Sequence, residues 1–85
     1  MIVAANWKMN PALDQAVALA TNLAGRHFSQ VKRVLFAPHP YLVPLSARLT
    51  GTTLKIGGQD CHFANHGAFT GDVSVAMLCD CGASS

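Results

Sequence analysis

The positions of apolar and polar residues divide the chain into short strand-like runs and longer helix-like segments. Runs of strand length, rich in apolar and β-branched residues, lie near residues 2–7, 31–37 and 53–58. Apolar residues spaced three or four apart, as on one face of a helix, lie near residues 11–24, 41–49 and 75–81. This alternation is typical of a parallel sheet joined by right-handed crossovers. We therefore predict an α/β fold and a single domain over residues 1–85.

Residues that favour caps and turns mark the ends of several predicted elements. Asn10-Pro11 is expected to open the first helix, because Asn is a good N-cap and Pro fits the first helical position. Gly25 suits the end of that helix, and Ser74 can cap the last one. The long loop 59–71 separates the third strand from the last helix, and loops of this length are usually functional.

Polar residues end the first predicted strand. Side chains alternate between the faces of a strand, so Asn6 and Lys8 share one face while Ala5 and Trp7 share the other. Polar groups at the carboxyl ends of parallel strands are where α/β proteins bind ligands. Lys8 offers a flexible point charge for a phosphate or a developing oxyanion. Taken by itself, such a lysine is more often a solvated charge at a strand end.

The composition predicts an apolar surface that another polypeptide covers. The chain of 85 residues is 51% hydrophobic and only 12% charged, against about a quarter charged in ordinary domains. A chain of this length buries only about 60% of its unfolded surface, so its own core gives marginal stability. We therefore expect self-association, with a homo-oligomer as the working assembly.

Charge and targeting signals exclude several classes of function. The net charge of +2 comes from scattered basic residues, and Lys32-Arg33 is the only adjacent pair. This is neither a nucleic-acid stripe nor a polybasic membrane patch. No apolar run approaches the roughly 18 residues of a membrane span, and no basic segment precedes an apolar one as in a secretory signal. Three cysteines, an odd number, indicate reduced thiols, and we expect a cytoplasmic protein.

Cysteine and histidine residues raise a separate hypothesis, a zinc site. Donor atoms of the right kind occur at Cys61, His62 and His66, and again at Cys79 and Cys81. His62 and His66 have an H-x₃-H spacing, but no C-x₂-C pair accompanies them, because Cys79 and Cys81 are only two positions apart. We therefore expect no metal and no cofactor.

Two motifs resemble those of the triosephosphate isomerase family. Residues 5–10 read Ala-Asn-Trp-Lys-Met-Asn and are similar to the motif that opens those enzymes. Residues 58–62 (Gly-Gln-Asp-Cys-His) and 67–74 (Gly-Ala-Phe-Thr-Gly-Asp-Val-Ser) resemble a second one, in the right order and at about the right distance. The resemblance implies the first three βα units of a (β/α)₈ barrel, incomplete in this chain, from an enzyme of glycolysis and gluconeogenesis.

The resemblance also implies roles for two residues of the first motif. Lys8 corresponds to a catalytic residue that holds the phosphate of a small phosphorylated triose and stabilises the enediolate. Asn6 corresponds to a residue that hydrogen-bonds the substrate. The expected activity is the interconversion of dihydroxyacetone phosphate and glyceraldehyde 3-phosphate.

The long loop resembles the segment that family members insert into a second subunit of a homodimer. Thr70 is similar to the residue that reaches across to the partner's asparagine and lysine. The other residues expected to support that interface are Gln59, Gly71 and Asp72.

The catalytic acid–base groups of the family have no counterpart among these residues. The family uses a glutamate base and a neutral histidine electrophile, both on later strands. The sequence contains no glutamate, so we expect the 85 residues to be inactive alone. The alternative is a non-catalytic, self-associating barrel fragment with weak phosphate binding.

Overall fold

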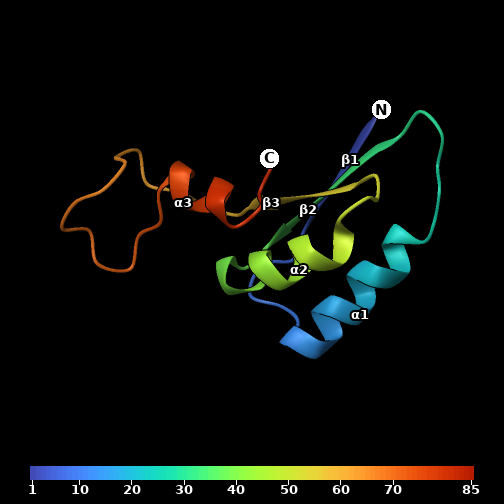
Figure 1. Cartoon of the computed structure of the whole chain (residues 1–85), viewed down its shortest axis with the longest axis horizontal. Helices are drawn as coiled ribbons and strands as arrows, with labels where there is room; N and C mark the ends of the chain where they lie inside the picture. The colour runs from blue at the N-terminus through green and yellow to red at the C-terminus, as the bar shows by residue number, and fades with distance from the viewer.

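The structure, a computed structural model that describes all residues 1–85, is an open three-stranded sheet with helices on one face (Figure 1). Its elements in chain order are β1 (Ile2–Asn6), α1 (Leu13–Ala24), β2 (Lys32–Ala37), the 3₁₀ turn η1 (His39–Tyr41), α2 (Leu42–Leu49), β3 (Leu54–Gly58) and α3 (Val75–Asp80). The sheet order is β1-β2-β3 and every pairing is parallel. The predicted α/β class and parallel sheet are therefore confirmed, and the sheet does not close.

The register brings the carboxyl ends of the strands to one edge of the sheet. Asn6 is aligned with Phe36, and Phe36 with Gly57. The ladder continues one residue past β1, where the Trp7 amide donates to the Phe36 carbonyl at 3.0 Å. Residues that follow β1 and β3 therefore lie close to the end of β2, and this closeness positions the site described below.

One face of the sheet forms the core with the helices. Leu35 and Ile56 from the strands contact α2, whose Leu42 and Leu45 are both 0% exposed. Ala5 and Trp7 pack against the same cluster, as the predicted alternation requires, whereas Lys8 lies beyond the end of β1 in a turn with a φ of +54°. Asn6 and Phe36 consequently lie on the opposite face, which no helix covers in Figure 1.

The start of the first helix differs from the prediction. Helix α1 begins at Leu13 rather than near residue 11, its N-cap is Ala12, and no side chain caps it. Asn10 was therefore wrongly predicted to be the cap. The physical reason is a tertiary contact, since the Tyr41 hydroxyl donates to the Pro11 carbonyl at 2.8 Å and holds this residue outside the helix.

The other helix ends follow the local signals more closely. Gly25 follows the last residue of α1, and its amide donates to the Thr21 carbonyl. The Ser74 hydroxyl accepts a hydrogen bond from the Met77 amide at 3.2 Å, so the predicted cap of α3 is confirmed. No helix of the structure has both the length and the apolar character that a membrane crossing needs.

The contact between β3 and α3 requires a glycine at position 58. A Cβ added to Gly58 would lie 2.7 Å from Leu78 Cδ1, and Leu78 is buried. We expect Gly58→Ala to lower the free energy of unfolding by about 1–3 kcal/mol, because the Leu78 side chain must leave its packed position. Urea titration measures this, and the double variant with Leu78→Val should lose less than the sum of the single changes. Strict additivity would contradict the proposed collision.

Candidate active site at the strand ends

Asn6 and Lys8 form a tight turn directly after β1. The Asn6 side-chain Oδ1 accepts a hydrogen bond from the Lys8 amide at 2.8 Å, a turn that Asn forms with the residue two positions later. Lys8 has a φ of +54°, in the left-handed region that costs a non-glycine residue roughly 1–3 kcal/mol. The turn therefore fixes Lys8 in a conformation that the surrounding contacts must maintain.

The Gln59 side chain supplies those contacts. Its Nε2 donates to the Lys8 carbonyl at 2.8 Å, to the Phe36 carbonyl at 3.0 Å and, more weakly, to Asn6 Oδ1 at 3.3 Å. One amide group thus links the ends of β1, β2 and β3. We name this arrangement of Asn6, Lys8 and Gln59 the strand-end clamp.

The clamp gives Gln59 a role that sequence reasoning missed. The resemblance placed Gln59 at a subunit interface, whereas its amide contacts residues of its own chain. The sequence did hold one signal for this role, which is that Gln59 directly follows a predicted strand. Residues that follow parallel strands meet at the same edge of the sheet. An interface role for Gln59 stays a prediction.

Replacing Gln59 by glutamate tests the clamp with almost no change of shape. Gln59→Glu places a carboxylate oxygen against three acceptor atoms. We expect a loss of about 1–2 kcal/mol in the free energy of unfolding, because three acceptors, one of them in a part-buried bond, lose their donor and meet a negative charge. Chemical denaturation measures the loss, and the control is Gln15→Glu on α1, where no such acceptors are contacted. Equal stability of the two variants would argue against the clamp.

The clamp leaves two donors available to a ligand. The Asn6 Oδ1 atom accepts hydrogen bonds within the chain. The Nδ2 atom of the same amide remains available to donate to a ligand. The Lys8 side chain is exposed, and its ammonium group makes no ion pair with any carboxylate of the chain. A cation and a neutral donor on one turn can hold a phosphate or an oxyanion. None of the four aspartates makes a hydrogen bond or ion pair with this turn.

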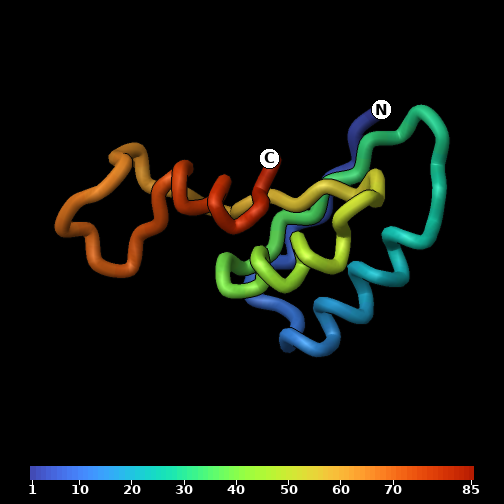
Figure 2. The backbone as a smooth tube through the Cα atoms, in the orientation of Figure 1, coloured from blue at the N-terminus to red at the C-terminus, as the bar shows by residue number.

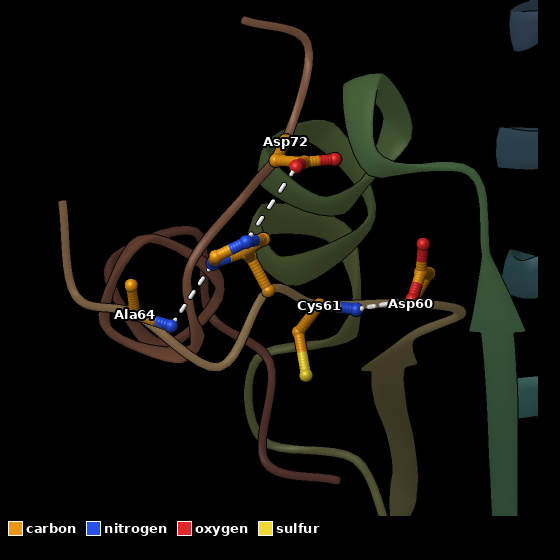
Figure 3. A network of polar contacts seen from close by, with 5 residues as sticks. Asp60, Cys61, Ala64 and Asp72 are labelled. Carbon is orange, nitrogen blue, oxygen red and sulfur yellow. Dashed lines mark hydrogen bonds and ion pairs between the residues drawn. The ribbon is translucent and has the colours of Figure 1, made fainter. Parts of the chain in front are cut away.

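The loop that carries Thr70 projects away from the sheet. Figure 2 traces it from the end of β3 outward and back to α3. Thr70 and Gly71 are exposed in it, and Gly71 has a φ of +89°. The Asp72 carboxylate lies 3.8 Å from His62 Nε2 within the same loop (Figure 3). An interface role for Thr70, Gly71 and Asp72 stays a prediction, because one chain alone contains no partner.

The cysteine and histidine residues do not gather into a metal centre. Cys61 and Cys79 line one groove of about 600 Å³, but His62 and His66 lie in a different pocket. No group of three or more metal-binding side chains is close enough to hold an ion. The three cysteines are free thiols.

Comparison with known proteins identifies the family. The family model "Triosephosphate isomerase" matches residues 1–85. The chain belongs to the triosephosphate isomerase family. A solved member, triosephosphate isomerase from Bartonella henselae, superposes with a TM-score of 0.78 at 36% sequence identity. The alignment covers 98% of this chain and 35% of that protein.

Membership of the triosephosphate isomerase family explains the open sheet. The chain spans about a third of the length of the solved isomerase it matches, and its strands are a parallel segment of that barrel. An eight-stranded barrel closes only when all of its strands are present. The outer edges of β1 and β3 are accordingly without a neighbouring strand.

Proposed function

We propose that these residues form the first part of the substrate site of a triosephosphate isomerase, which interconverts dihydroxyacetone phosphate and glyceraldehyde 3-phosphate. The observation that carries the proposal is the strand-end clamp. It fixes Lys8 at a φ of +54° while leaving its ammonium group unpaired. Backbone strain of this kind tends to occur at functional sites, where neighbouring contacts maintain it.

Each residue of the turn has a distinct role in the proposed reaction. The Lys8 ammonium binds the phosphate and offsets the negative charge that develops on the enediolate oxygen. The Asn6 Nδ2 donates to a substrate oxygen, because its Oδ1 is already bonded to the Lys8 amide. Gln59 touches no substrate and acts as a positioning residue, since its amide holds the Lys8 carbonyl.

The proton-transfer step requires groups that these residues lack. Moving a proton between adjacent carbons needs a base within hydrogen-bond reach of the substrate. The sequence has no glutamate, and none of its aspartates makes a hydrogen bond or ion pair with the turn. We therefore propose that the 85 residues bind the phosphorylated substrate but do not turn it over alone.

The proposed assembly is a homodimer in the cytoplasm. The projecting loop would insert into a second copy through its exposed residue Thr70, with Gly71, Asp72 and Gln59 supporting the interface. Exposed apolar side chains in this loop, Phe63 and Phe69, support burial against a partner. The three free thiols support a reducing compartment.

A graft tests the proposed function. In the graft, residues 1–85 replace the aligned segment of the Bartonella henselae isomerase, which supplies the remaining strands. We expect the graft to interconvert the two triose phosphates, and the 85 residues alone to show no rate above a Lys8→Ala control. A folded graft without activity would refute the proposed function.

The alternative is a non-catalytic, self-associating fragment with weak phosphate binding. It is favoured by the exposed apolar residues Met1, Ile2, Val3 and Phe28 near the unpaired edge of β1. Sedimentation of the 85-residue chain discriminates, because this alternative predicts large, concentration-dependent assemblies rather than a defined dimer.

A further inference from the structure

His62 occupies the centre of the projecting loop. Its side chain is 16% exposed, although Phe63 beside it is 95% exposed. The imidazole ring stacks on Phe69, with centroids 4.1 Å apart, and on Phe63 at 4.5 Å. Aromatic stacking of this geometry stabilises beyond the area that it buries. His62 is therefore the main internal contact of a loop that has little other core.

Polar contacts of the same ring join both limbs of the loop. In the part of the loop that leaves β3, His62 Nδ1 accepts a hydrogen bond from the Ala64 amide at 3.0 Å. In the part that leads back to α3, which we call the returning limb, the Asp72 carboxylate lies 3.8 Å from His62 Nε2. The dashed lines in Figure 3 mark both contacts, with Ala64 and Asp72 on different sides of the network. The His62 backbone amide also donates to the Val73 carbonyl at 2.7 Å.

The returning limb turns sharply at Thr70 and Gly71. The Asp72 amide donates to the Phe69 carbonyl at 3.0 Å, which closes a four-residue turn over residues 69–72. Gly71 occupies the third position with a φ of +89°, the value that a type II turn requires there. His62 contacts the side chains at both ends of this turn, through Phe69 and Asp72.

We propose that His62 is the positioning residue of the projecting loop, which holds the 69–72 turn and so presents Thr70 to a second copy of the chain. Holding both ends of a turn fixes the direction of its two central residues. The loop conformation rests on the contacts of His62 alone, whereas the presentation of Thr70 rests on the proposed dimer.

Three substitutions of His62 separate its contacts. His62→Ala removes the ring and the acceptor together. His62→Phe keeps the stacking on Phe69 and removes the acceptor for Ala64. His62→Asn keeps an acceptor near Nδ1 and removes the stacking, and both variants lose the contact with Asp72. The matched control is His66→Ala in the same loop, since His66 is exposed and makes no hydrogen bond or ion pair.

Amide hydrogen exchange of the 85-residue chain measures the loop, and sedimentation measures self-association. We expect His62→Ala to reduce the protection of the Asp72 amide by about tenfold or more, and His66→Ala to leave it unchanged. His62→Phe should retain protection at Asp72 and lose it at Ala64, and His62→Asn should show the opposite pattern. Protection of the Leu35 amide reports whether the whole chain is folded. If His62→Ala unfolds, the exchange patterns of His62→Phe and His62→Asn still test the inference.

Hydrogen exchange and sedimentation test the two parts of the inference separately. Unchanged protection at Asp72 in His62→Ala, with Leu35 also protected, would overturn the positioning role. Lost protection together with unchanged self-association would overturn the interface on which the presentation of Thr70 rests. Both effects together, with neither in His66→Ala, support the inference.

Discussion

Lys8→Ala is expected to lower kcat/KM of the graft by about a thousandfold, which corresponds to about 4 kcal/mol of lost transition-state stabilisation. The strand-end clamp holds Lys8 in a strained turn while its ammonium group is free to meet an anionic ligand. Alanine removes the only positive charge at this turn. The loss appears in KM through the phosphate and in kcat through the developing oxyanion.

A steady-state assay with glyceraldehyde 3-phosphate measures this loss. The matched control is Lys32→Ala in the graft, because Lys32 begins β2 at the opposite end of the sheet and is also exposed. Its kcat/KM should stay within about threefold of the unaltered graft. Equal losses in the two variants would mean that net charge, and not the position of Lys8, carries the effect.

Leu42→Ala is expected to lower the free energy of unfolding of the 85-residue chain by about 2–5 kcal/mol. Leu42 is 0% exposed and lies in the cluster that joins α2 to the sheet. A domain of this length has a total stability of roughly 4–13 kcal/mol, so the cavity removes a large share of it. The urea concentration at the midpoint of unfolding should then fall sharply.

Urea unfolding followed by circular dichroism measures the change, with Val43→Ala as the control on the same helix. Val43 is 58% exposed, so this substitution should change stability by less than about 0.5 kcal/mol. If both variants lose the same stability, the core does not lie on this face of α2.

The fold could be predicted because the apolar residues follow simple periods. Leu35 and Ala37 of β2 lie on the face that meets the helices while Val34 and Phe36 lie on the other face, and Leu42, Leu45 and Leu49 recur at helical spacing on α2. Such periods depend only on which face meets the core, so they can be read without knowledge of the neighbours. The same reasoning placed Ala5 and Trp7 on one face of the first strand, and both pack against the core in the structure.

The start of α1 could not be predicted from local signals. Asn10 and Pro11 are favourable residues for a helix start, yet Tyr41, thirty residues later, bonds to the Pro11 carbonyl. A tertiary hydrogen bond of this kind competes with the local preference and leaves no trace in the sequence around residue 10.

Much of the candidate site was likewise beyond sequence reasoning. The positions of Asn6 and Lys8 follow from the strand pattern, but the clamp depends on which strand lies next to which. Gln59 reaches the Phe36 carbonyl only because β2 lies between β1 and β3. The contacts of His62 with Phe69 and Asp72 arise in an aperiodic loop, where spacing carries no information about contact.

The most direct test of the central claim is a crystal structure of the graft with glycerol 3-phosphate bound. The claim is that the strand-end clamp presents Lys8 and Asn6 to a phosphorylated substrate. We predict that Lys8 Nζ lies about 2.7–2.9 Å from a ligand oxygen, that Asn6 Nδ2 donates to the ligand, and that Gln59 Nε2 remains on the Lys8 carbonyl. A bound ligand that neither Lys8 nor Asn6 touches would contradict the claim.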